Sequence, residues 1–113
     1  MGEGDFHNRD RVMRAIAGSN IHDGGWAKRP QQSINYLSSH DGKTLADLVG
    51  KDKQRQFLGI MMVLTSQGVP MLGEGSEMMF SKKGHHNSYD RPDLNRLNWN
   101  KAKKHKDLVE AVA

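Results

Sequence analysis

The sequence predicts an α/β fold in which a helix connects two short parallel strands. The first observation is the order of patterns along the chain, which alternates strand and helix twice after residue 31. The second is the connection of about thirty residues between the strands, a length that favours parallel pairing and a right-handed crossover. The third is an apolar content of 35%, which is low for a domain with a large core of its own. Two parallel strands leave both sheet edges open, so we expect the arrangement to need further strands.

The chain starts with a predicted helix over residues 9–17, in which Asn8 is the N-cap and Gly18 the stop. Residues 19–29 are rich in glycine and polar side chains and are typical of a loop. Pro30 then favours an extended backbone at the residue that enters it, Arg29. These signals predict one helix and one loop before the first strand.

The first strand is predicted over residues 31–37, which have β-branched and aromatic side chains near their centre. Residues 44–49 fit one or two helical turns that end at Gly50. The longest predicted helix covers residues 53–67, with Asp52 as its cap. Its apolar residues recur at helical spacing and are expected to face a core. They are Phe57, Ile60, Met61 and Leu64.

The second strand is predicted over residues 69–72, directly after Gly68. Residues 73–90 then form a polar, glycine-containing loop, and loops of this length are often functional. A final amphipathic helix is expected from Asn100 to the end of the chain, with Trp99 as its anchor in the core. The predicted elements therefore follow a βαβα order after the first helix.

Composition excludes several classes of site. The 113 residues contain no cysteine, so no disulfide framework and no thiolate metal site is expected. No apolar stretch reaches the roughly 20 residues that span a bilayer, and the first residues lack the pattern of a signal peptide. A cytoplasmic location, with no cofactor and no metal, is the expectation. The adjacent histidines His85 and His86 lack a third ligand at suitable spacing.

The net charge of +4 comes largely from Lys82, Lys83 and the basic run at 101–106. Clustered lysines are found in phosphate-binding surfaces, but here no aromatic residues are interleaved and no nucleic-acid-binding motif is present. A solvated helix surface is the favoured interpretation. A basic nucleic-acid-binding protein stays open as a second alternative.

The strongest candidate for a functional site is the His40–Asp41 pair, which follows the first strand. Side chains at the carboxyl end of a strand are held by a rigid scaffold and often carry chemistry. Taken without its surroundings, the pair also fits an ordinary turn, because Asp41 precedes Gly42 and Asp-Gly is a strong turn signal. The neighbouring segments decide between these two interpretations.

Three segments together resemble a known enzyme family. I-N-Y-L-S-S-H-D-G-K-T-L-A-D-L, at 34–48, resembles the fourth conserved region of the α-amylase family of glycoside hydrolases. Q-G-V-P-M-L-G-E-G-S-E, at 67–77, is similar to the eighth barrel strand of that family. G-H-H-N-S-Y-D-R-P-D-L-N-R-L-N-W, at 84–99, is similar to a loop of pullulanases and glycogen-debranching, isoamylase-like enzymes. Ala46 stands where a bulky aromatic residue is common in pullulanases, so both subtypes stay open.

The resemblance implies a (β/α)8 TIM barrel of which strand seven lies at 33–37 and strand eight at 69–72. Residues 1–113 would then be the C-terminal part of a catalytic barrel domain, incomplete as an isolated chain. The family is retaining and uses an Asp nucleophile and a Glu acid/base. Both lie on earlier strands, so we expect the 113-residue chain alone to be inactive.

For the site, the resemblance implies that Asp41 and His40 stabilise the transition state by hydrogen bonds to sugar hydroxyls. The candidate substrate-binding residues lie in the last segment, where amide, carboxylate and phenol groups suit sugars. They are Asn87, Tyr89, Asp93 and Asn95. Catalysis by Glu74 or Glu77 is not expected.

The function implied is hydrolysis of α-1,6-glucosidic links in an α-glucan such as glycogen, starch or pullulan. One alternative is a non-catalytic glucan-binding or complementing subunit, whose partner would be the missing half of the barrel. No membrane and no nucleic-acid partner is expected under either interpretation.

Overall fold

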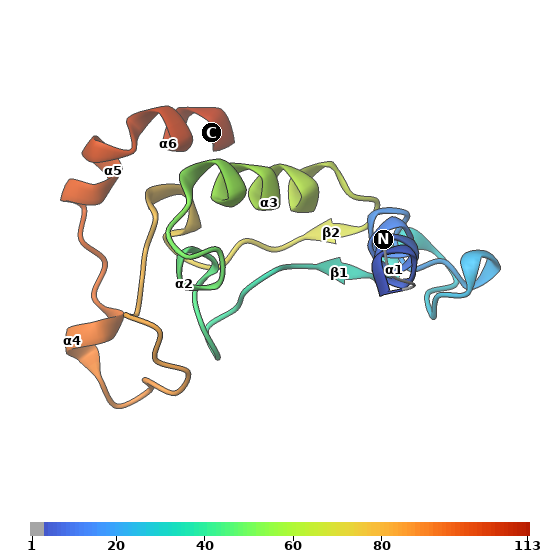
Figure 1. The fold of residues 1–113 in the computed structure, drawn as a ribbon, viewed down its shortest axis with the longest axis horizontal. Helices are drawn as coiled ribbons and strands as arrows, with labels where there is room; N and C mark the ends of the chain where they lie inside the picture. The colour runs from blue at the N-terminus through green and yellow to red at the C-terminus, as the bar shows by residue number, and fades with distance from the viewer. Residues whose placement is uncertain (1–3) are drawn as a thin grey trace. The chain divides into compact units, whose positions relative to one another are not determined.

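The computed structural model describes residues 4–113 (Figure 1), and its side chains from residue 8 onward. The described residues form two compact units. The first contains the residues up to 35 together with residues 62–71, and the second contains residues 36–61 and 72–113. The two units are stabilised by different kinds of contact. None of the described helices is long and apolar enough to cross a membrane.

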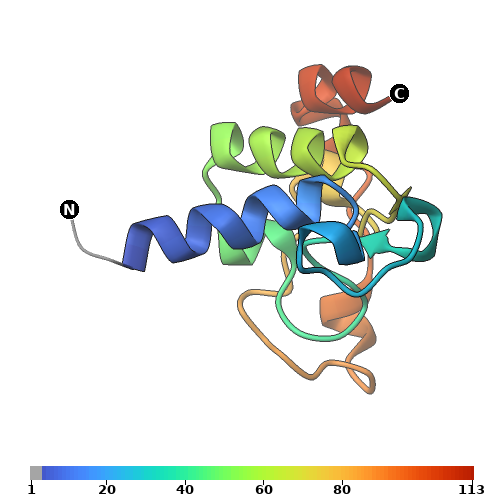
Figure 2. The same ribbon diagram turned by 90° about the vertical axis from the view of Figure 1, so that its right-hand side faces the viewer.

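In the first unit, helix α1 covers Gly4–Ile16 (Figure 2). The predicted cap at Asn8 is wrong, because the helix already begins at Gly4 and Asn8 lies inside it. The predicted stop at Gly18 is confirmed. Its φ of +78° is the left-handed conformation that ends a helix, and its amide donates to the carbonyl of Ala15 at 3.0 Å.

The loop that follows is more ordered than predicted. It contains one short 3-10 turn, η1 at Ile21–Asp23. A second one, η2 at Pro30–Gln32, follows the loop and takes the place of the start of the predicted strand. The extended entry that Pro30 predicts is confirmed, because Arg29 before it has φ −140° and ψ 144°. Pro30 itself begins the turn, since its fixed φ suits the first position of a helical turn. The Gln32 side chain accepts from the Arg29 amide at 3.1 Å and stabilises this turn.

The first strand, β1, is accordingly shorter than the predicted 31–37 and consists of Ile34–Asn35. It pairs in parallel with β2, Val69–Pro70, so that Ile34 lies opposite Val69 (Figure 1). The predicted parallel pairing is confirmed, and the predicted strand lengths are wrong. Pro70 has no amide hydrogen to donate, which helps to keep the ladder short. The described residues thus have an α/β arrangement with one two-stranded sheet.

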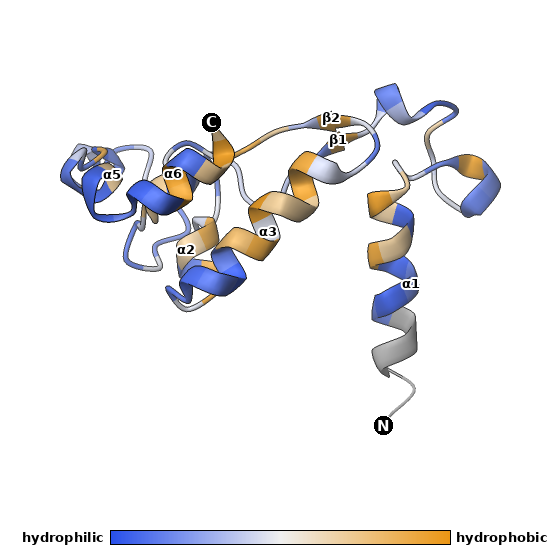
Figure 3. Ribbon diagram, turned by 90° about the horizontal axis from the view of Figure 1, so that it is seen from above, coloured by the Kyte–Doolittle hydropathy of each residue, from blue (hydrophilic) through white to orange (hydrophobic). Residues whose placement is uncertain are grey.

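Helix α3, Lys53–Thr65, is the long helix that the apolar pattern predicts. The predicted cap is confirmed, since Asp52 Oδ1 accepts from the amides of Gln54 and Arg55 at 2.9 and 3.0 Å. The predicted apolar stripe is buried only in part, because Ile60 is fully buried whereas Phe57 is exposed. Figure 3 shows hydrophilic residues at the start of this helix and mostly hydrophobic residues over the rest of it.

Short helices complete the second unit. They are α2 at Leu45–Leu48, η3 at Ser76–Met78, α4 at Pro92–Asn95, α5 at Asn100–Lys104 and α6 at Lys106–Val112. The predicted final helix is therefore broken at His105, and the predicted loop at 73–90 contains one 3-10 turn. Thr44 caps α2 by accepting from the Asp47 amide at 3.2 Å.

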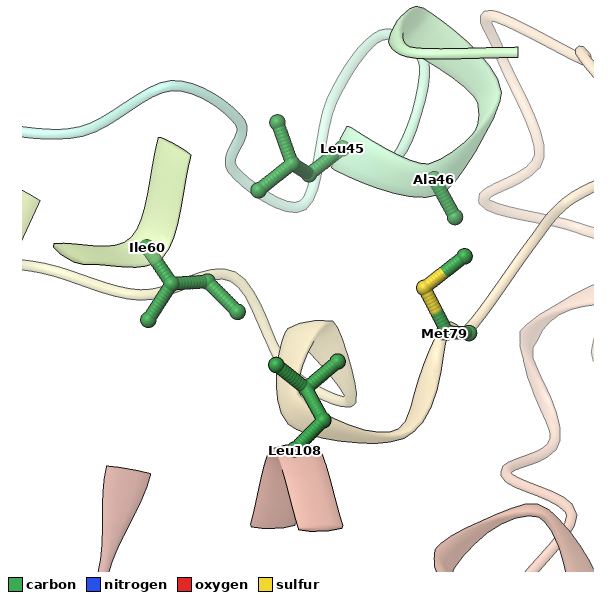
Figure 4. Packing of buried hydrophobic residues seen from close by; sticks show 5 residues of the cluster. All are labelled: Leu45, Ala46, Ile60, Met79 and Leu108. Atoms are coloured by element: carbon green, nitrogen blue, oxygen red, sulfur yellow. The ribbon is translucent and has the colours of Figure 1, made fainter. Parts of the chain in front are cut away.

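The core of the second unit is one cluster of buried residues (Figure 4). It consists of Leu45, Ala46, Ile60, Met79 and Leu108. Leu108 is the residue that anchors the end of the chain. The predicted anchor, Trp99, is exposed, because Trp99 precedes α5 whereas the apolar face that reaches the core belongs to α6.

Candidate functional site

A cavity of about 240 Å³ lies in the second unit, between three segments of the chain. The first segment follows β1 in the sequence, the second follows β2, and the third precedes and includes α4. Most of its lining side chains are polar. They are Ser38, Ser39, His40, Asp41, Thr44, Glu74, Ser76, Lys82, Ser88, Tyr89 and Asn95, with Gly73 and Phe80 completing the wall.

His40 and Asp41 stand beside this cavity with their side chains open to solvent. His40 Nε2 lies 3.3 Å from Asp41 Oδ2, and the two side chains are 90% and 85% exposed. Gly42 follows with a φ of +72°, so the Asp-Gly turn is also present. An ordinary turn and a functional pair are therefore compatible interpretations, because the turn leaves both side chains exposed to solvent. Their donor and acceptor atoms are available to a ligand.

The residue that sequence reasoning missed is Lys82. The sequence favoured a solvated position for all of the clustered lysines, yet Lys82 is only 4% exposed whereas Lys83 is exposed. Lys82 Nζ donates to the main-chain carbonyl of His40 at 3.0 Å. Two adjacent lysines give no signal in the sequence for which of them is buried. Only the contact across 42 residues identifies it.

Asp47 fixes the segment that contains Lys82. Its carboxylate accepts from the Lys82 amide at 2.9 Å, from the Ser81 hydroxyl and from the Thr44 hydroxyl. Partial burial raises the pKa of Asp47, but the hydrogen bonds from Ser81, Thr44 and the main chain outweigh it and lower the pKa below its ordinary value of 3.8. The carboxylate is therefore ionised at neutral pH and connects α2 with residues 81–82.

Of the four residues predicted to bind substrate, two line the cavity. Tyr89 is exposed, with its ring free to contact a ligand. Asn95 is partly engaged: its Oδ1 accepts from the Ser88 hydroxyl at 2.8 Å, and its Nδ2 donates to the Ser88 carbonyl. Each amide atom of Asn95 keeps one further donor or acceptor position.

The other two, Asn87 and Asp93, are exposed and do not belong to the cavity lining. Asp93 forms a two-bond ion pair with Arg91, at 2.9 Å from Nε to Oδ1 and 2.8 Å from the terminal nitrogen to Oδ2. The hydrogen bond from Arg91 lowers the pKa of Asp93. Asp93 therefore has a structural partner at the start of α4.

The remaining polar groups are the other histidines and acidic residues and the basic run. No group of three His, Asp or Glu side chains suited to a metal occurs among the residues that the structure describes. Glu74 lines the cavity and Glu77 does not. In the basic run, Lys101 Nζ donates to the Met79 carbonyl at 3.0 Å and Lys106 pairs with Glu110 at 3.2 Å.

Relatives with known names match most of the chain. No protein-family model matches it. The pullulanase of Bacillus subtilis is 33% identical over 125 residues, which cover 96% of this chain and 17% of the relative. Isoamylase 1 of rice is 28% identical over 153 residues, covering 88% of this chain and 19% of the relative.

Solved structures agree with the sequence relatives. The pullulanase from Paenibacillus barengoltzii, crystallised with maltohexaose and α-cyclodextrin, matches 91% of this chain and 18% of its own at a TM-score of 0.82 and 34% identity. The pullulanase from Bacillus acidopullulyticus matches 91% of this chain and 14% of its own at a TM-score of 0.81 and 32% identity. The chain spans less than a fifth of the length of these relatives. Over most of its length, this polypeptide is of the pullulanase and isoamylase type in sequence, and it matches pullulanase chains in fold.

Proposed function

We propose that this chain forms the substrate-binding wall of an α-glucan hydrolase site, and that the complete site cleaves α-1,6-glucosidic links in glycogen, starch or pullulan. The observation that carries the proposal is the clustering of His40, Asp41, Tyr89 and Asn95 around one polar cavity. Carboxylate, imidazole, amide and phenol groups are the side chains that suit sugar hydroxyls and a pyranose face. The malto-oligosaccharides bound in pullulanase structures are ligands of the same class.

In this proposal, Asp41 accepts hydrogen bonds from two hydroxyls of one sugar ring, and His40 donates to a hydroxyl of the same sugar. Such bonds favour catalysis when they strengthen as the oxocarbenium-like transition state develops. The exposed ring of Tyr89 stacks on a neighbouring sugar. Asn95 binds sugar hydroxyls with the acceptor and donor positions that Ser88 does not occupy. Asn87 and Asp93 lie outside the cavity lining, so we assign them only to sugar units beyond it.

We further propose that β1 and β2 are neighbouring strands of a (β/α)8 barrel and that residues 1–113 belong to its C-terminal part. The parallel pairing of the two strands supports this, as does the position of the cavity segments directly after each strand in the sequence. The nucleophile and acid/base would come from other strands of the barrel, in the same longer polypeptide or in a partner chain. The 113-residue chain alone is then expected to bind glucan without hydrolysing it.

The test is a titration of the ¹⁵N-labelled 113-residue chain with maltotetraose and with a malto-oligosaccharide that has one α-1,6 branch. We expect amide shifts at residues 38–41 and 88–95, and binding about tenfold weaker for Asp41→Asn, since hydrogen bonds to a charged group are worth about 1.5–3 kcal/mol. Asp10→Asn, an exposed acid on α1, is the matched control and should bind like the unmodified chain. Shifts that are absent from these residues, or equal losses in both variants, would contradict the proposal.

A further inference from the structure

We propose that Lys82 is a positioning residue for the glucan site: its buried ammonium holds the main chain at His40, and so fixes the turn that presents His40 and Asp41. The inference rests on the proposed function for its effect on binding. Its structural part, the ordering of the turn, stands on the contacts alone.

The first step is the lack of other restraints on the turn. Between residues 39 and 43, the bond from Lys82 Nζ to the His40 carbonyl is the only hydrogen bond to another segment within the part of the chain that the structure describes. The His40 and Asp41 side chains interact with each other and are otherwise exposed. Gly42 adds backbone freedom. Without Lys82, no hydrogen bond from another described segment holds residues 39–43.

The second step is the rigidity of Lys82 itself. Its amide donates to Asp47, and the preceding Ser81 hydroxyl donates to the other oxygen of the same carboxylate. Asp47 lies on α2, whose residues Leu45 and Ala46 are part of the buried core. A continuous path of bonds therefore leads from the core through Asp47 and Lys82 to the His40 carbonyl.

The third step is the cost of burying the ammonium. A lysine that is 4% exposed loses most of its hydration, which is unfavourable unless the charge has hydrogen-bond partners. An ammonium has three donors, and in the described residues one of them meets a protein acceptor. Lys82 is also one of the residues that line the polar cavity. A buried charge beside a polar cavity is better explained by a role at the site than by core packing.

Two lysines provide matched controls. Lys101 Nζ also donates to a main-chain carbonyl, that of Met79, at the same distance of 3.0 Å, but Lys101 does not line the cavity. Lys101→Met therefore removes the same kind of bond away from the site. Lys83→Met removes the same charge from the same loop, where the side chain is exposed. Lys82→Arg keeps the charge and a donor.

The experiment compares Lys82→Met with these variants by ¹⁵N relaxation of residues 39–43 and by maltotetraose titration. We expect the order parameters of residues 39–43 to fall in Lys82→Met alone, glucan binding to weaken about tenfold, and Lys82→Arg to recover most of both. Unchanged order parameters in a folded Lys82→Met chain would overturn the proposal, as would equal losses in Lys101→Met.

The two proposals fail in different ways. If the unmodified chain does not bind glucan, the proposed function fails, while the order parameters still decide the role of Lys82. If Lys82→Met has an ordered turn and normal affinity, the positioning role fails and the glucan site stands. Should Lys82→Met be unfolded, the Lys82→Gln variant, which keeps a donor without the charge, replaces it. If residues 39–43 in Lys82→Gln then have the same order parameters as in the unmodified chain, the ammonium is not required and the proposal is overturned.

Discussion

The second unit buries a cluster of apolar side chains from α2, α3, η3 and α6, and the cavity lies in the same unit. In the first unit, Ala27 and Val63 are the buried hydrophobic residues within 8–113, while Ile34 and Val69 remain exposed. The first unit is ordered mainly by main-chain bonds, such as those from the amides of Ala27 and Trp26 to the Ser19 carbonyl. The difference shows that the site is supported by a packed core, whereas the sheet relies on local backbone geometry.

The largest expected effect tests the packed core of the second unit. Ile60→Ala removes a side chain with 0% exposure and should lower the free energy of unfolding by about 2–5 kcal/mol. Ile34→Ala is the same change in the first unit, at a residue that is 58% exposed, and should cost about 0.5 kcal/mol. Urea unfolding followed by circular dichroism measures both. Equal losses would show that the two units do not differ in this way.

A smaller effect tests the backbone geometry of the first unit. Gly68 has a φ of +120°, and a Cβ there would lie 2.8 Å from the Ser33 carbonyl oxygen. Gly68→Ala should therefore cost about 1–3 kcal/mol and shift the amide signals of β1 and β2. In Gly42→Ala, φ is +72° with no atom within 4 Å, so the cost should be about 1 kcal/mol and the strand signals should not change. Strand signals that shift in both variants, or in neither, would refute this account of Gly68.

An effect of similar size concerns the carboxylate that connects α2 with residues 81–82. The pKa of Asp47 is lower in the folded chain than its ordinary value of 3.8. Its contribution to stability is therefore fully present above pH 3.8 and is lost as the pH falls through the folded-state pKa. Asp47→Asn should lower stability at neutral pH by about 1–3 kcal/mol, and the gap to the unmodified chain should narrow in acid. Unfolding curves at several pH values, with Asp10→Asn as the control, measure the difference in unfolding free energy between Asp47→Asn and the unmodified chain. A difference that grows as the pH falls would contradict the lowered pKa of Asp47.

Local signals identified one helix cap and one helix stop, and the length of the connection between the strands predicted their parallel pairing. Asp52 and Gly18 were identified correctly because a cap or a stop depends on the residue and its immediate neighbours. The strand at 31–37 was predicted too long because β propensity depends on which residues find a pairing partner. Trp99 was misassigned for a similar reason: its size suggests burial, but the position of α5 leaves it exposed.

The sequence predicted in part which residues lie together at the cavity. His40, Asp41, Tyr89 and Asn95 come together at one cavity, as the segments after each strand suggest. The sequence could not show that Asn87 and Asp93 lie outside the cavity lining. The direction of a loop side chain is set by contacts such as that between Asp93 and Arg91. Lys82 had no signal at all, since its partner is a main-chain carbonyl 42 residues away.

By itself, the sequence determined the α/β order of elements, the main cap and stop residues, and the likeness to pullulanases and isoamylases, because each is encoded by neighbouring residues or by linear motifs. The tertiary structure alone decided which of two adjacent lysines is buried, which polar residues share the cavity, and how short the strands are. The physical reason is that burial and hydrogen-bond partners are properties of distant segments brought into contact. Periodicity and propensity describe one segment at a time.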